Sequence, residues 1–188
     1  MILGMTTQTF TVVHTTLSLI GIVAGFVVMF GLLGGKQLDK WTALFLLTTV
    51  LTSVTGFFFP FDHLLPSHKV GIISLLVLAV AILARYPLHL VGGWRRTYVL
   101  TAVMALYLNV FVLVVQLFLK VPALHAMAPT QQEPPFLVVQ VIVLALFIWL
   151  AIAAVKTFRE GPAGRWASQL NRLRRSTEKD EVQNEEPA

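Results

Sequence analysis

The segment FLVVQVIVLALFIWLAIAAVK, residues 136–156, decides the fold class of this chain. Its one charged residue, Lys156, stands at its end, and its one strongly polar interior residue is Gln140. A helix on the surface of a soluble domain keeps a polar face toward water, and this segment has no such face. As an α-helix it extends about 30 Å, the thickness of the hydrocarbon layer of a bilayer. The segment therefore predicts a transmembrane helix.

Four more segments have the same length and apolar character. The five predicted spans are approximately 11–33, 41–59, 69–86, 98–119 and 136–156. The third is the shortest and the weakest of the five. The connecting segments carry glycine, proline and charges, as expected at the ends of spans. The sequence thus predicts an all-α, polytopic helix bundle of five spans over residues 1–160.

The composition of the whole chain agrees with a membrane protein. Of its 188 residues 56% are hydrophobic and 12% are charged, whereas soluble domains carry about 25% charged residues. The net charge of +5 is spread between and after the spans and forms no separate basic module, so we expect a lipid bilayer and no nucleic acid as partner. Other membrane subunits or a homo-oligomer remain open as partners. The absence of cysteine excludes disulfides, iron–sulfur clusters and thiolate metal sites.

The distribution of lysine and arginine predicts the orientation, because these residues resist translocation. One side of the predicted bundle receives only Lys69 and Lys120. The opposite side receives all the others: Lys36, Lys40, Arg85, Arg95, Arg96, Lys156, Arg159, Arg165, Arg172, Arg174, Arg175 and Lys179. We therefore expect the amino terminus outside and the carboxyl terminus in the cytoplasm, in a bacterial-type inner membrane. The first apolar segment lacks the positive flank and cleavage site of a secretory signal and is read as a retained span.

Two segments follow the spans. Residues 161–175 place Trp166, Leu170 and Leu173 on one helical face with arginines around the rest. This pattern is typical of a basic amphipathic helix on the inner leaflet, although a fraying positive flank has the same composition. Residues 176–188 are acidic, almost free of apolar side chains and predicted to be disordered.

With this orientation, the polar residues of the spans gather in their outer halves. The layer consists of His14, Thr15, Thr16, Ser18, Thr52, Ser53, Thr55, Ser74, Asn109, Gln116 and Gln140. Helix packing explains part of it, since hydroxyls bond to their own helix and amides join neighbouring helices, and Gly21 and Gly25 permit close helix contacts. The convergence of all five spans at one depth, beside four of the five histidines, predicts a polar cavity open to the outside.

Haem is one candidate ligand for this cavity, because a b-type site needs two imidazoles on facing helices. His14 and His68 would lie at similar depth if their helices are neighbours. This layout resembles that of small haem-binding helix bundles among the b-type cytochromes, in which histidines near helix ends hold the haem. The resemblance covers these two positions and the general architecture, and it implies electron transfer.

A metal ion is the second candidate. Asp62, His63 and His68 share one short outer segment, and a further ligand, His125 or Glu133, would come from another. Histidine and carboxylate ligands suit zinc, copper or iron. The spacing of these residues matches no established metal-binding motif, and histidines at a membrane surface are commonly only solvated.

An apolar ligand with a polar head, such as a quinone or a lipid, is the third candidate. Asn109, Gln116, Gln140 and His14 would hold its head beneath the aromatic run Phe57–Phe59, which has a simpler interpretation as a belt facing lipid.

The sequence leaves the reaction class open. It contains no phosphate-binding loop, dinucleotide fingerprint, nucleophile elbow or HExxH helix, and no carboxylate lies within a predicted span. The function best supported by the sequence is a small inner-membrane protein with an outward-facing, histidine-bearing site for a redox cofactor, metal or quinone-like ligand. The alternative is a non-catalytic subunit or assembly factor of a larger complex, and whether the chain is an enzyme stays undetermined.

Overall fold

The computed structural model describes residues 2, 4–59, 66–158, 166 and 169–175. Within these residues the regular structure is helical, apart from an isolated bridge between Ile2 and Met5. The helices are α1 (Thr7–Leu33), α2 (Asp39–Gly56), α3 (Pro66–Arg85), α4 (Trp94–Lys120), α5 (Pro122–Met127) and α6 (Pro134–Thr157). The predicted all-helical fold class is confirmed for this part of the chain.

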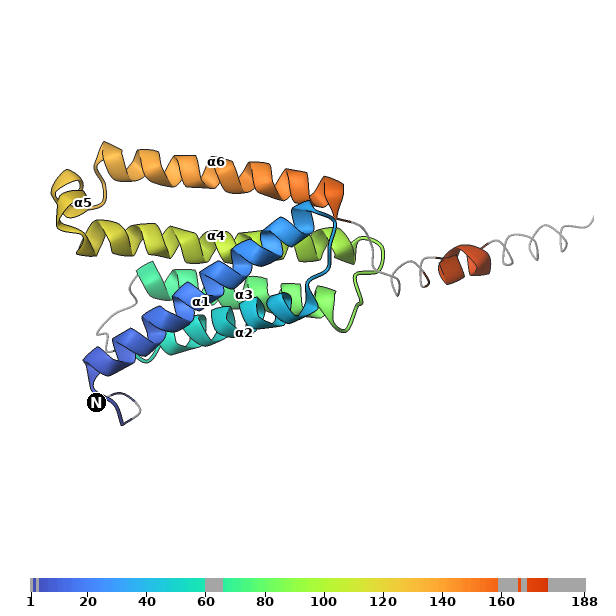
Figure 1. Ribbon diagram of the computed structural model, residues 1–188, viewed down its shortest axis with the longest axis horizontal. Coiled ribbons are helices and arrows are strands. Elements are labelled where there is room, and N and C mark those ends of the chain that lie inside the picture. The colour runs from blue at the N-terminus through green and yellow to red at the C-terminus, as the bar shows by residue number, and fades with distance from the viewer. Residues whose placement is uncertain (1, 3, 60–65, 159–165, 167–168, 176–188) are drawn as a thin grey trace, which may run out of the picture.

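The long helices α1, α2, α3, α4 and α6 run back and forth along the long axis of the molecule, and the short α5 joins α4 to α6 at one end (Figure 1). We call this end, which carries His14, His68 and His125, the histidine end. The opposite end carries Arg85 and Arg95 and is called the arginine end. In the sequence, the histidine end corresponds to the side that was predicted to be outside.

Four helical segments are long and apolar enough to cross a membrane: Thr7–Leu33, His68–Arg85, Trp94–Lys120 and Pro134–Thr157. Their mean hydropathies range from 1.9 for His68–Arg85 to 2.9 for Pro134–Thr157. Among the long helices described, α2 is not apolar enough to be counted as a candidate span. Its mean hydropathy is lowered by Asp39 and Lys40 at its start and by its threonines. The expectation that the third span would be the weakest was therefore wrong.

The bundle places apolar side chains outside and many of its polar side chains inside. On α6, Val141, Ile142 and Trp149 are each more than 60% exposed. The buried polar residues are Thr42, Thr48, Thr49, Ser53, His68, Ser74, Arg85, Asn109 and Gln140. In water the exposed apolar side chains would cost free energy, whereas in lipid they do not. The arrangement supports a multi-pass membrane protein.

Glycines on α1 let its neighbours approach closely. A Cβ atom on Gly25 would lie 2.6 Å from Leu106 Cδ1 and 2.9 Å from the Phe45 ring. One on Gly21 would lie 3.1 Å from Thr48 Oγ1. The predicted role of Gly21 and Gly25 in helix packing is thus confirmed, and it brings α1 against α2 and α4.

The arginine end is held together by charged groups that find partners within the protein. The Arg85 side chain is 7% exposed, forms an ion pair with Asp39 and lies 5.4 Å from the centre of the Tyr98 ring. Arg95 donates hydrogen bonds to the carbonyl oxygens of Val155 and Phe158 at the end of α6. These contacts tie α2, α3, α4 and α6 to one another.

The connection between α4 and α6 is more regular than the irregular loop expected from its prolines. Pro122 stands in the first turn of α5, where its missing N–H and fixed φ are tolerated. Before α6, the Glu133 carboxylate accepts hydrogen bonds from the Thr130 amide and hydroxyl and from the Gln132 amide. Slight desolvation raises the pKa of the Glu133 carboxyl, but these hydrogen bonds outweigh it, so the pKa lies below its ordinary value.

Part of the predicted basic segment, residues 161–175, is described. Trp166 and residues 169–175 are helical, and Trp166, Leu170 and Leu173 are each more than 60% exposed. The acidic stretch 176–188 lies outside the described residues. The predictions of an interfacial helix and of a disordered tail stay predictions.

Candidate functional site

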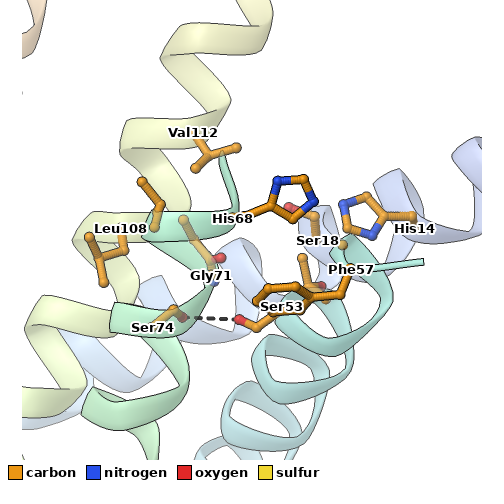
Figure 2. Close-up of a pocket in the computed structure, with 13 residues that line it drawn as sticks. His14, Ser18, Ser53, Phe57, His68, Gly71, Ser74, Leu108 and Val112 are labelled. Carbon is orange, nitrogen blue, oxygen red and sulfur yellow. Dashed lines mark hydrogen bonds between the residues drawn. The ribbon is translucent and has the colours of Figure 1, made fainter. Parts of the chain in front are cut away.

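A partly open cavity of about 110 Å³ lies at the histidine end, among α1, α2, α3 and α4. Its lining consists of His14, Ser18, Thr52, Ser53, Gly56, Phe57, His68, Val70, Gly71, Ser74, Leu108, Asn109 and Val112. Figure 2 shows these side chains, with the imidazoles of His14 and His68 coming from opposite sides and facing each other. The described structure thus has a polar cavity at the depth where the sequence predicted one.

His14 is held in place by α2. Its Nδ1 atom lies 2.9 Å from Thr55 Oγ1, and its ring contacts Phe59 edge-on at 5.2 Å between ring centres. The Thr55 hydroxyl in turn donates to the carbonyl oxygen of Leu51 at 2.7 Å, one turn back along the same helix. Since Nδ1 faces Thr55, it is the remaining nitrogen, Nε2, that is directed toward the cavity (Figure 2).

His68 lies near the start of α3 and is 4% exposed. Its ring packs against the Phe57 ring, with 5.6 Å between the ring centres. Phe57 also lies close to Gly71, where an added Cβ would be 3.2 Å from the ring. A side chain at position 71 would require the Phe57 ring to shift by a few tenths of an ångström, so Gly71 permits the close packing of Phe57 beside His68.

The floor of the cavity is a network of hydroxyl and amide groups. Ser53 donates to Ser74 across α2 and α3 at 3.0 Å, drawn as the dashed line in Figure 2. Asn109 Nδ2 donates to Thr49 Oγ1 at 3.1 Å, which joins α4 to α2. The buried Thr52 Oγ1 has no hydrogen-bond partner among the described residues, so its hydroxyl is available to a ligand or water.

The rest of the lining is apolar. Phe57 and Val70 stand on the side of His68, and Leu108 and Val112 come from α4. With histidine neutral, none of the lining residues, all of which are described, carries a formal charge. The cavity therefore combines uncharged hydrogen-bonding groups with apolar walls.

The structure brings together three of the five residues predicted to bind a cofactor: His14, His68 and Asn109. Gln116 is exposed and does not line the cavity. Gln140 is buried, but its Nε2 atom donates to the carbonyl oxygen of Phe111 at 3.3 Å, between α4 and α6. A spacing of seven residues keeps Asn109 and Gln116 on one face of α4 to within about 20°, but it separates them by about 10 Å along the helix axis, so that Gln116 lies beyond the cavity.

Of the four predicted metal ligands, the structure places His68 and His125. His125 is exposed on α5 and does not line the cavity, and Asp62 and His63 lie outside the described residues. Within the described part of the chain, no three histidine, aspartate or glutamate side chains form a group that could hold a metal ion.

Sequence reasoning missed six residues of the lining: Gly56, Phe57, Val70, Gly71, Leu108 and Val112. The aromatic run Phe57–Phe59 was interpreted from the sequence as a belt facing lipid. Of these three residues, Phe58 is exposed, at 46%, as a lipid-facing side chain would be. Phe57 and Phe59 pack on His68 and His14. The available signal was the position of this run at the end of α2, directly beside both histidine-bearing helix ends.

The size of the cavity separates the candidate ligands. Ligand pockets of drug-sized molecules measure about 300–1,000 Å³, and a cavity of about 150 Å³ holds a benzene ring. The cavity here, about 110 Å³, is on the scale of one small ring or a few water molecules. A porphyrin macrocycle is larger than this space.

Four apolar helices and buried polar groups define a multi-pass membrane protein with a small polar cavity at one end. No family model, curated protein or solved structure matches this chain. Its function has to be argued from the cavity itself.

Proposed function

We propose that the chain crosses the membrane five times, with the histidine end outside and the carboxyl terminus in the cytoplasm. The exposed side chains of α2 between Trp41 and Val54 support α2 as the fifth span, because they are all apolar: Trp41, Ala43, Leu44, Leu47, Leu51 and Val54. The threonines that lower its hydropathy, such as Thr42 and Thr49, are buried against other helices. Lipid thus meets an apolar surface on α2 as on the other long helices.

Single cysteines test this topology cleanly, since the natural chain has none. Lys36→Cys and Phe58→Cys place exposed thiols at the two ends of α2. A maleimide that cannot cross membranes, added to intact cells, should label Phe58→Cys and leave Lys36→Cys unlabelled until the cells are opened. Equal labelling of both in intact cells would show that α2 does not cross.

We infer that the cavity binds the single-ring head group of a membrane quinone or quinol. The observation that carries this function is the union of His14, His68 and Asn109 in one uncharged cavity of about 110 Å³. That volume is below the about 150 Å³ of a cavity that holds benzene, so part of the substituted ring would lie inside the cavity and the rest in its open mouth. The apolar tail of such a molecule would extend from the partly open cavity into the surrounding lipid.

The absence of charge in the lining favours this ligand over a metal ion. A buried divalent ion needs anionic partners or several strong ligands to offset its lost hydration. The described lining supplies neutral imidazole, hydroxyl and amide groups, which instead match the carbonyl or hydroxyl groups of a neutral ring. His14 and Thr52 are placed to make such hydrogen bonds.

Binding of decylubiquinone and its reduced form to the purified protein tests this function, by calorimetry in detergent. His14→Ala and His68→Ala should each weaken binding at least tenfold, because each removes a hydrogen-bonding ring from the lining. His125→Ala is the matched control, since His125 lies on α5 outside the cavity. It should bind like the natural protein.

Two results would overturn the proposal. Binding that the His14 and His68 variants do not weaken would place the ligand elsewhere. A natural protein that binds neither form, but binds zinc or copper or shows a haem Soret band dependent on these histidines, would replace quinone by that cofactor. Failure of all these ligands would leave the non-catalytic subunit as the better account.

A further inference from the structure

The hydrogen-bond chain behind His14 determines which of its ring nitrogens carries the proton. The Thr55 hydroxyl donates its only hydrogen to the Leu51 carbonyl at 2.7 Å, with the Thr52 carbonyl a longer alternative at 3.2 Å. A carbonyl oxygen can only accept, so Thr55 Oγ1 is left as an acceptor toward His14. The 2.9 Å contact between His14 Nδ1 and Thr55 Oγ1 is therefore an Nδ1–H donor bond.

A neutral imidazole with its proton on Nδ1 has a lone pair on Nε2. Figure 2 shows a ring nitrogen of His14 on the side of His68, and because Nδ1 contacts Thr55 we assign this nitrogen as Nε2. His14 Nε2 thus faces the cavity as a hydrogen-bond acceptor of fixed sense. The serine and threonine hydroxyls around it, such as those of Ser18 and Thr52, can turn to donate or accept.

We propose that this acceptor makes the site selective for the reduced, hydroxyl-bearing form of its ligand, with Thr55 as the positioning residue. The inference rests on the proposed function. A quinol hydroxyl donates to Nε2, whereas a quinone carbonyl at the same place would set two lone pairs against each other. One hydrogen bond gained in one form and opposed in the other predicts a preference of at least about tenfold.

The preference is measured by calorimetry with decylubiquinol, kept reduced under anaerobic conditions, and decylubiquinone. Thr55→Val removes the acceptor for Nδ1 with little change in shape and should reduce the preference below about threefold. Thr55→Ser keeps the hydroxyl and should retain it. Thr101→Val is the matched control, because among the described residues the Thr101 hydroxyl bonds to carbonyls of its own helix, those of Thr97 and Tyr98.

A second readout needs no ligand. In ¹⁵N NMR of histidine-labelled protein, with the His14 signals assigned by their loss in His14→Gln, Nδ1 should be the protonated nitrogen and Nε2 the unprotonated one. Thr55→Val should shift the signals toward a mixture of both tautomers, and Thr101→Val should leave them unchanged.

The outcomes separate this inference from the function on which it rests. Equal binding of both forms, tighter binding of the quinone, or a preference unchanged in Thr55→Val would overturn the selectivity and leave the binding site in place. A proton on Nε2 in the natural protein would overturn the role of Thr55. Binding of neither form would overturn the proposed function, and with it the selectivity.

Discussion

The two ends of the bundle bury polar groups in different ways. At the arginine end the buried Arg85 is charged and is paired within the protein, with Asp39 and Tyr98. At the histidine end the polar groups of the lining are uncharged, and they surround a space of about 110 Å³. The partners of Arg85 thus belong to the protein itself, whereas the lining at the histidine end encloses space for a ligand.

This difference indicates which polar groups serve the fold and which serve a site. A charge inside a bundle is tolerated only when a partner offsets its lost hydration, so the contacts of Arg85 and Arg95 are explained by stability. Neutral hydroxyls and imidazoles can be satisfied either by the protein or by a guest. We therefore expect substitutions at the arginine end to change stability and those at the histidine end to change binding.

Arg85→Ala should give the largest loss of stability, about 2 kcal/mol in the free energy of unfolding. Most of this loss comes from the packing of the buried stem and from the contact with Tyr98. The ion pair adds little, because the Asp39 side chain is 79% exposed and well solvated. Denaturation in detergent measures the effect.

The exposed Arg96 provides the control. Arg96→Ala should change the unfolding free energy by less than about 0.5 kcal/mol. Ligand binding by Arg85→Ala should stay within twofold of the natural protein when measured on folded material. A tenfold loss of binding would show that the two ends are not separate in function.

Asn109→Leu should have the opposite effect to Arg85→Ala, a loss of ligand binding with little change in stability. It replaces an amide of the cavity lining by an apolar group of similar size, so quinone binding should fall about tenfold while stability changes by about 1 kcal/mol or less. Gln140→Leu is matched to it, since Gln140 is also a buried amide but lies between α4 and α6. Equal loss of binding in both variants would contradict the assignment of the site.

The hydrogen bond from Ser53 to Ser74 should contribute less. A double-mutant cycle with Ser53→Ala and Ser74→Ala is expected to give a coupling free energy of about 0.6 kcal/mol, the average for such contacts between membrane helices. Thermal unfolding of the four proteins measures it. A coupling near zero would mean that this part of the floor is satisfied by water or ligand instead.

The smallest effect concerns pH at the loop before α6. Because the pKa of the Glu133 carboxyl is lowered in the folded protein, its contribution is complete above the ordinary carboxyl pKa and is lost as the pH falls through the lowered value. The melting temperature of the natural protein should therefore fall slightly as the pH drops through this range. Glu133→Gln should abolish this fall and leave ligand binding unchanged. A larger acid effect in Glu133→Gln than in the natural protein would contradict the sign.

The sequence was sufficient for the helices because lipid imposes a simple requirement on them. The segments predicted at 11–33, 98–119 and 136–156 lie within α1, α4 and α6, which extend them by a few residues. The boundaries differ because helices continue into interfacial residues such as Thr7 and Trp94. α2 was harder to assess, since its threonines lower the hydropathy although they face other helices.

The site was only partly predictable. Depth along a span follows from residue number, and this placed His14, His68 and Asn109 at one level. Gln116 lies about 10 Å along α4 from Asn109, beyond this level. The direction of a side chain around the helix axis depends on the neighbouring helices, and this separated Gln140 from the cavity. The place of Phe57 depends on Gly71, a contact between two helices that no local pattern reveals.

The most direct test of the central claim is to locate the bound ligand. A photoreactive azidoquinone, crosslinked to the protein in membranes and mapped by mass spectrometry, should label residues of α1, α3 and α4 around the cavity, and excess decylubiquinol should prevent the labelling. Labelling spread over the exposed apolar face of α6, insensitive to competition, would contradict the claim that this cavity is the binding site.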